Sequence, residues 1–283
     1  MKTWFITGAN GGLAYPMLEI LLERGDRVAA TVRKPQALDG LQKKYGPRLW
    51  QTNLDLTEPH SIRQAVNQAI DDLGTIDILV NNAGYGMYGA VEEASDEQIE
   101  HLFQTNFFGS LRVARAFMPY FRAQGKGHIV QIASMVGQTS NPGLGLYAAS
   151  KWAVEGAFEA LAKEAAPFNI KLTMIEPGGI RTGFFSVNGV IEQELDVYHD
   201  QPAREFIRYY SAKEGIDTIP GDPQKMAKAI IQRVDEGKGP LRLALGSDAY
   251  EGIKAALTSR LAELEAQKEL SYSTDVDDVV HNR

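Results

Sequence analysis

The chain has 283 residues, 44% of them hydrophobic, and a formal net charge of −7 at pH 7. This length is enough for one large α/β domain, and the negative charge excludes the basic face that a nucleic-acid partner requires. The absence of cysteine excludes a disulfide framework and a thiolate nucleophile and fits a reducing compartment, so we expect a cytoplasmic protein.

The sequence carries no signal for a metal site or a membrane span. The histidines form no close pair with the spacing of metal ligands, so we expect no metal site. We expect all five to be surface or helix-end residues: His60, His101, His128, His199 and His281. No apolar run approaches the ~20 residues of a membrane-spanning helix, so we expect no membrane partner.

Short strand-like runs alternate with longer amphipathic runs along the chain. The pattern predicts strands at residues 4–7, 27–32, 49–54, 76–81, 127–133, 170–175 and 241–245. It predicts helices at residues 13–24, 35–45, 59–73, 96–121 (with a break near Gly109), 147–166, 222–236 and 248–270. This alternation favours a Rossmann-type, doubly wound parallel sheet of about seven strands, with helices on both faces and ligands at the carboxyl ends of the strands.

The alternation stops between residues 183 and 221, a stretch that is rich in aromatic residues. A long insertion after a strand end is typical of a substrate lid, and a pair of surface helices with aromatic anchors is the alternative. We therefore predict a single domain over residues 1–270 that includes a lid at about 183–221. Residues 271–283 are polar and acidic and are expected to form a loose tail.

A glycine-rich turn follows the first predicted strand, in the order Thr7-Gly8-Ala9-Asn10-Gly11-Gly12-Leu13-Ala14. Glycines at this position let backbone N–H groups approach a pyrophosphate at the start of a helix, although a simple tight turn is the alternative. The second predicted strand ends at Thr31-Val32-Arg33-Lys34, without the acidic residue of NAD-binding proteins. Arg33 could grip a 2′-phosphate or be a solvated helix-start charge. The sequence favours NADP(H), and NAD(H) stays possible.

Tyr147 and Lys151 are four residues apart in a predicted helix and so lie on the same helix face. A neighbouring ammonium group favours the phenolate, so we expect it to lower the pKa of Tyr147 from its usual value of about 10. A tyrosine of this kind can exchange a proton near neutral pH. The spacing alone also fits an exposed helix face.

Seven motifs in order resemble the landmarks of the classical short-chain dehydrogenase/reductase family, over residues 3–182. They are Thr7-Gly8-x-x-x-Gly12, Asp55, Asn81-Asn82-Ala83-Gly84, Asn106, Ser134, Tyr147-x-x-x-Lys151 and Pro177-Gly178-Gly179-Ile180-Arg181-Thr182. The resemblance implies a Rossmann-type fold and an oxidoreductase. Residues 241–270 are loosely similar to bacterial members that resemble hydroxysteroid dehydrogenases.

The resemblance also implies the roles of four catalytic residues. Tyr147 would be the acid or base, and Lys151 would lower its pKa and hold the nicotinamide ribose. Ser134 would donate a hydrogen bond to the substrate oxygen, with helix capping as the alternative. Asn106 would hold a water molecule that connects Lys151 to solvent, with a helix kink as the alternative.

The cofactor contacts that the resemblance implies extend along the first two thirds of the chain. They are Gly8, Asn10, Gly11, Gly12, Leu13, Arg33, Asp55, Leu56, Asn82, Ala83, Gly84, Tyr147, Lys151, Pro177, Gly178, Ile180 and Thr182. The chain departs from the family at Ala14, which replaces the third glycine of the turn, and at Pro16. Because that glycine allows close packing of the helix on the strand, we expect weaker NADP(H) binding than in relatives.

These features predict an NADP(H)-dependent carbonyl reductase or secondary alcohol dehydrogenase. Its substrate would be a small ketone or alcohol that is apolar or cyclic. An epimerase or dehydratase on the same fold and a non-catalytic NADP-binding regulator are the alternatives, but a regulator of this kind usually lacks the tyrosine or the lysine. We expect a homodimer or homotetramer, because the helices at 96–121 and 147–166 commonly form the interface in this family.

Overall fold

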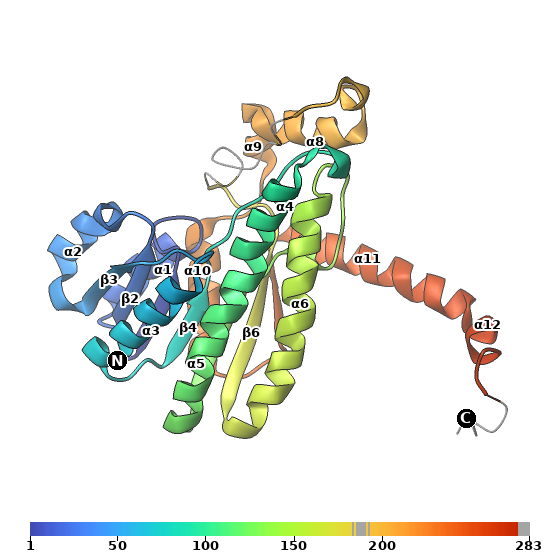
Figure 1. The fold of residues 1–283 in the computed structure, drawn as a ribbon. Coiled ribbons are helices and arrows are strands. Elements are labelled where there is room, and N and C mark those ends of the chain that lie inside the picture. Colours follow the sequence, from blue (N-terminus) through green and yellow to red (C-terminus); the bar gives the residue numbers. More distant parts are fainter. Residues whose placement is uncertain (183, 185–190, 192, 277–283) are drawn as a thin grey trace.

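Parallel strands form a seven-stranded sheet in the part of the chain that the computed structural model describes, which is residues 1–182, 184, 191 and 193–276 (Figure 1). The strand order is β3-β2-β1-β4-β5-β6-β7. The strands are β1 (Thr3–Thr7), β2 (Arg27–Val32), β3 (Leu49–Asn53), β4 (Ile78–Asn81), β5 (Gly127–Ile132), β6 (Ile170–Pro177) and β7 (Arg242–Leu245). The predicted doubly wound fold is thereby confirmed.

Helices connect successive strands and cover both faces of the sheet. Before β5 they are α1 (Ala14–Glu23), α2 (Asp39–Tyr45), α3 (Pro59–Leu73), α4 (Asp96–Phe103) and α5 (Ser110–Gln124). After β5 they are α6 (Gly145–Ala165), α8 (Pro202–Ser211), α9 (Lys213–Thr218), α10 (Pro223–Glu236), α11 (Ser247–Ala266) and α12 (Lys268–Tyr272). Figure 1 shows α11 and α12 extending away from the sheet. No described helix combines the length and the apolar character of a membrane span.

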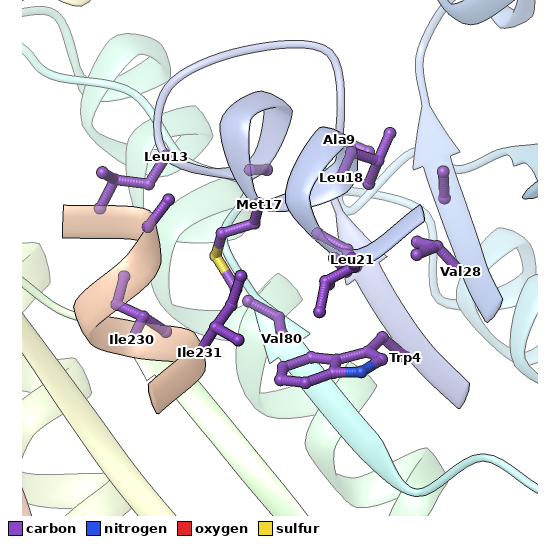
Figure 2. Close-up of a cluster of buried hydrophobic side chains, with 14 of the residues drawn as sticks. Trp4, Ala9, Leu13, Met17, Leu18, Leu21, Val28, Val80, Ile230 and Ile231 are labelled. Carbon is purple, nitrogen blue, oxygen red and sulfur yellow. The ribbon is translucent and has the colours of Figure 1, made fainter. Parts of the chain in front are cut away.

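Alternate residues of each strand enter two separate cores, as the twofold repeat of a strand requires. Trp4 and Ile6 of β1 pack with α1, α2 and α10, whereas Phe5 packs on the opposite face with α3, α5 and α6. Figure 2 shows part of the first core, with Met17 of α1 and Ile231 of α10 pointing toward one another. The two buried faces explain why the central strands have continuous apolar runs.

The strand order reverses between β1 and β4, which are neighbours although two strands lie between them in the sequence. After β1 the chain continues into α1 on one face of the sheet, and after β4 it continues into α5 on the other face. An open α/β sheet binds its ligands in the crevice at such a reversal. The turn after β1 and the Asn82-Ala83-Gly84 loop after β4 both lie there.

The helix predicted at 96–121 contains the expected break near Gly109. A π-helical turn (Gln104–Gly109) separates α4 from α5. A Cβ on Gly109 would lie 2.7 Å from Leu56 Cβ and 3.0 Å from Leu56 O, so the helix passes the loop after β3 at a distance that only glycine permits. Other boundaries differ as well: for example, α6 already begins at Gly145, and α12 continues to Tyr272, inside the predicted tail.

His128 is a correction to the expectation that the histidines are surface or helix-end residues. It lies on β5 with 7% of its surface exposed. Its Nε2 is 2.9 Å from the hydroxyl of Thr173 on the neighbouring strand β6. Burial and the positive charges of Lys171, Lys2 and Arg233 lower the pKa of His128 to about 4, so the ring is neutral at pH 7.

The predicted lid region contains α8 and α9, while residues 183, 185–190 and 192 lie outside the described part of the chain. Arg204 of α8 is 5% exposed and forms an ion pair with the buried Glu93. Glu93 Oε1 also accepts a hydrogen bond from Leu195 N (2.8 Å), and its Oε2 accepts one from Ala90 N (2.7 Å). These contacts attach α8 to the segment that follows β4.

Candidate active site

A cavity of about 1600 Å³ lies at the carboxyl ends of the strands. Its lining includes the turn after β1, the ends of β2 and β4, the residue that follows β5, and the loop after β6. Every site residue predicted from the sequence except Asn106 lines it. The sequence motifs therefore converge on one place, because each follows a strand that ends at the same edge of the sheet.

The turn after β1 is bound directly to the loop after β4. Thr7 Oγ1 accepts hydrogen bonds from the backbone N–H groups of Asn82 (3.0 Å) and Ala83 (3.1 Å). The Asn82 side chain donates to Thr7 O (3.0 Å) and Gly8 O (3.1 Å). Gly8 has φ +63° and lies so close that an added Cβ would be 2.9 Å from Ala83 Cα. A residue with a side chain does not fit there.

This turn fits a dinucleotide phosphate. Gly12 has φ +58°, and space is open for 4 Å around the position of a Cβ on Gly11. The backbone is thus accessible from the cavity beside the N-terminus of α1, which favours anions. Arg33 is exposed at the cavity wall directly after β2. Hydrogen bonds from the Thr57 side chain and backbone lower the pKa of Asp55, which keeps it ionised as an acceptor.

Ala14 and Pro16 both lie in the first turn of α1. Ala14 is fully buried in the core that Trp4 and Met17 share. Pro16 is the third residue of α1, where a backbone N–H has no partner within the helix. The proline therefore removes no helical hydrogen bond, and α1 forms without interruption.

Tyr147 and Lys151 lie one turn apart on α6, and 7% and 6% of their surfaces are exposed. The Lys151 ammonium is 5.8 Å from the centre of the Tyr147 ring and donates a hydrogen bond to Ile132 O (3.0 Å). The Ser134 hydroxyl forms a hydrogen bond with Tyr147. Ser134 Oγ also accepts from Val136 N (3.3 Å), so this residue caps a short helical turn as well.

The pKa of Tyr147 shifts in the direction opposite to the sequence-based expectation. Burial raises it to about 12, and the hydrogen bond from Ser134 opposes this rise only in part. Burial lowers the pKa of Lys151 to about 8, against the raising effect of the Glu155 charge. Loss of hydration outweighs the Ser134 hydrogen bond at Tyr147 and the Glu155 charge at Lys151. At neutral pH the phenol therefore keeps its proton.

Asn106 lies in the π-helical turn and is 2% exposed. Its Oδ1 accepts from Tyr85 N (3.0 Å), and its Nδ2 donates to Tyr85 O (2.9 Å) and Ser150 Oγ (3.1 Å). A Cβ on Gly84 would be 3.0 Å from Asn106 Oδ1 and 3.9 Å from Lys151 Nζ. Asn106 thus joins the loop after β4 to α6 behind Lys151.

Three features of the site have no counterpart in the sequence-based prediction. Tyr85 OH is 2.8 Å from His101 Nδ1, and both residues line the cavity. Asp248 of α11 accepts a hydrogen bond from Gly179 N (2.7 Å) and ties that helix to the loop after β6. Glu155 lies one helical turn beyond Lys151, so continuing the four-residue spacing past Lys151 would have found it. The other two contacts join segments that are distant in the sequence.

Known proteins resemble this chain over nearly its whole length. Residues 2–189 match the family model described as short chain dehydrogenase. Oxidoreductase BOA17 of Botryotinia fuckeliana is 36% identical over 276 residues, which covers 96% of this chain and 99% of that protein. The 3-ketodihydrosphingosine reductase of Bacteroides thetaiotaomicron is 36% identical over 241 residues, covering 85% of this chain and 86% of that protein.

Solved structures show the same relationship. A short-chain dehydrogenase from Streptomyces avermitilis has a TM-score of 0.88 and 37% identity, covering 97% of this chain and 100% of that one. A short chain dehydrogenase from Burkholderia cenocepacia in complex with NADP has a TM-score of 0.71 and 26% identity, covering 94% and 98%. The fold, the ordered motifs and these matches agree: the chain belongs to the short-chain dehydrogenase family of oxidoreductases.

Proposed function

We propose that the protein is an NADP(H)-dependent carbonyl reductase or secondary alcohol dehydrogenase. The observation that carries this proposal is the position of Ser134, Tyr147 and Lys151 on the wall of the cavity that also contains the phosphate-type turn. A proton donor and an anion-binding turn share one space, which is the arrangement that hydride transfer coupled to proton transfer requires.

The cofactor would lie along the turn after β1, with its adenosine near Asp55 and its nicotinamide at the loop after β6. The bound nicotinamide supplies or accepts a hydride. Arg33 supports NADP(H), because its planar guanidinium pairs with a phosphate and no carboxylate occupies the end of β2. The relative from Burkholderia cenocepacia, solved in complex with NADP, supports the same assignment. Binding of NAD(H) remains compatible with the site.

Three buried residues would each act on a proton or a charge. Tyr147, protonated at neutral pH, would donate its proton to a carbonyl oxygen in the reduction and accept one in the oxidation. The Ser134 hydroxyl, already bonded to Tyr147, would donate to the same oxygen as negative charge develops on it. The Lys151 ammonium would stabilise the phenolate that remains, and Asn106 would hold the backbone behind it.

The substrate class follows from the cavity wall beyond Tyr147. Tyr88, Val136 and Leu144 surround Tyr147 in one apolar cluster, and Phe184 packs against it with its ring centre 5.8 Å away. These side chains favour an apolar ketone or alcohol, including cyclic ones. The name of the Bacteroides relative, a keto-compound reductase, supports reduction of a carbonyl group.

Loss of NADPH absorbance with a panel of cyclic, aryl and long-chain ketones tests the proposal. We expect turnover by the wild type and a loss of at least ~100-fold in Tyr147→Phe, because that variant has no proton to donate. Binding of NADPH should persist in the variant. Tyr250→Phe, an exposed tyrosine of α11, is the matched control and should retain activity. Full turnover by Tyr147→Phe would refute the proton-transfer role.

Assembly and location complete the proposal. We propose a homodimer or homotetramer, supported by the apolar side chains Phe108 and Trp152, which are 38% and 43% exposed beside α5 and on α6. Figure 1 shows these two long helices side by side on one face of the molecule. A cytoplasmic location is supported by the absence of cysteine from the sequence.

A further inference from the structure

Two acidic side chains meet in the interior directly behind Lys151. Glu155 follows Lys151 by one turn of α6, and Glu176 lies near the end of β6; 5% and 2% of their surfaces are exposed. Arg242 Nε is 2.9 Å from Glu155 Oε2 and 3.4 Å from Glu176 Oε1, so the two carboxyl groups lie beside each other, and a hydrogen bond between them shifts the pKa of each. Two ionised carboxylates offer only acceptors and repel each other, so this contact needs a proton on one of them.

A buried carboxyl oxygen without a hydrogen-bond donor also indicates a proton on one of the two groups. Glu155 Oε1 is buried and accepts no hydrogen bond from any N–H or hydroxyl donor among the described residues. A buried acceptor without a donor is costly. A proton held between the two carboxyl groups supplies the missing donor.

The single guanidinium group that contacts the pair balances one negative charge rather than two. Arg242 Nε, from β7, is 2.9 Å from Glu155 Oε2 and 3.4 Å from Glu176 Oε1, and its Nη2 is 2.7 Å from Glu159 Oε2. One guanidinium thus faces three carboxyl groups. From the loop after β5, the neutral amide of Gln138 donates to Glu176 Oε1.

Two further cations lie near this cluster. Arg260 of α11 donates a hydrogen bond to Gln138 O, and Gln138 in turn contacts Glu176. Lys151 lies on the same helix as Glu155, and the Glu155 charge raises its pKa against the effect of burial. Of these groups, Lys151 is the one that belongs to the acid–base cluster, and the pair can act on the reaction only through it.

We propose that Glu155 and Glu176 share one proton near neutral pH and act as a positioning pair whose charge controls the charge of Lys151. Loss of the shared proton to water adds a full negative charge one helical turn from the ammonium and favours its charged form. The pair thereby extends the working range of the acid–base centre toward alkaline pH. This consequence for activity rests on the proposed function, whereas the shared proton does not.

The directions of the pKa shifts of the two carboxyl groups agree with the geometry. Burial and the charge of Glu176 raise the pKa of Glu155 to about 7, and burial also raises the pKa of Glu176. The pair therefore loses its proton below the pH of about 8 at which Lys151 titrates, and the Glu155 charge already contributes to keeping the pKa of Lys151 from falling further.

Infrared difference spectroscopy of the full-length protein between acidic and alkaline pH tests the shared proton without any substrate. We expect the carbonyl band of a protonated carboxylic acid that disappears with a midpoint near 7, and a shift of this band on ¹³C-labelling of glutamate. Glu155→Gln and Glu176→Gln should each lack the band. Glu159→Gln should keep it, because Glu159 binds Arg242 but is not part of the pair. Absence of the band from the wild type, or its persistence in both pair variants, would overturn the proposal.

The pH profile of ketone reduction tests the link to Lys151. In Glu155→Gln the alkaline limb of the kcat profile should move to lower pH by roughly one unit, because one negative charge near Lys151 is lost. The limb of Glu159→Gln should not move. A lower kcat with an unmoved limb would show a merely structural role and overturn the proposed control. If the wild type reduces no ketone, the proposed function fails, and the infrared result still decides whether the pair shares a proton.

Discussion

At the scale of the residue, Tyr147 keeps its proton at neutral pH because its phenol is buried at the inner wall of the cavity. Its pKa is about 12 and that of Lys151 is about 8. At neutral pH the phenol is thus a donor, which suits the reduction of a carbonyl group. A sequence motif indicates which residues meet, but the direction of the pKa shift depends on how much water the fold removes from them.

Arg33 carries the proposed preference for NADP(H), and its replacement should separate the two cofactors. Arg33→Ala should weaken NADPH binding by roughly 10- to 100-fold and NADH binding much less, since a hydrogen bond to a charged group contributes about 1.5–3 kcal/mol. Lys34→Ala is the matched control, because Lys34 is the next exposed cation but does not line the cavity. Fluorescence titrations with both cofactors give the affinities. Equal losses for NADPH and NADH would contradict the role of Arg33.

At the scale of the element, the start of α1 combines a buried core with the phosphate-type turn. Ala14→Gly should tighten NADPH binding, because a smaller residue lets the helix approach the strand more closely. It should also lower the free energy of unfolding by about 0.5–1 kcal/mol, since glycine disfavours a helix and the buried methyl group is lost. NADPH titration and urea unfolding of the two proteins measure these effects. Equal affinities would contradict the expected weak binding of the natural turn.

The pairing of β5 with β6 buries a neutral histidine, which makes stability sensitive to acid. The pKa of His128 is about 4 in the folded protein and about 6.5 in the unfolded chain. Because the unfolded chain binds the proton more readily, this contribution is complete above pH 6.5 and is lost as pH falls through 4. The loss is on the order of 3 kcal/mol.

His128→Gln removes the titrating ring and keeps a side chain that can reach Thr173. The wild type should lose on the order of 3 kcal/mol more unfolding free energy than this variant between pH 6.5 and 4. Urea unfolding at each pH measures the difference, and other titrating groups cancel because both proteins share them. Parallel losses in the two proteins would mean that His128 is not held neutral.

Part of the fold and of the site could be predicted from the sequence alone. The strands and the residues that follow them were predictable, because alternation and glycine turns are local signals and parallel strands end at one edge. The earlier start of α6 at Gly145, the burial of His128 and the meeting of Glu155 with Glu176 were not predicted. The last two depend on contacts between elements that are distant in the sequence, namely β5 with β6 and α6 with β6.

At the scale of the whole molecule, the reversal of strand order between β1 and β4 creates the crevice that all site motifs share. One half of the sheet contributes the turn after β1 and Arg33, and the other contributes Ser134, Tyr147 and the loop after β6. Helices α8 and α9, which belong to the region predicted to form a lid, lie above this edge (Figure 1). Under the proposed function the first half would hold the cofactor and the second would hold the catalytic residues, so motifs far apart in the chain would serve one cavity.

The proposed function requires that a hydride pass from NADPH to a ketone in this cavity. Mass spectrometry of the alcohol formed with NADPH deuterated at nicotinamide C4 tests this transfer most directly. We expect one deuterium on the former carbonyl carbon with one of the two C4 diastereomers, none with the other, and no product from Tyr147→Phe. Alcohol without deuterium from both diastereomers, or no alcohol from any apolar ketone, would contradict it.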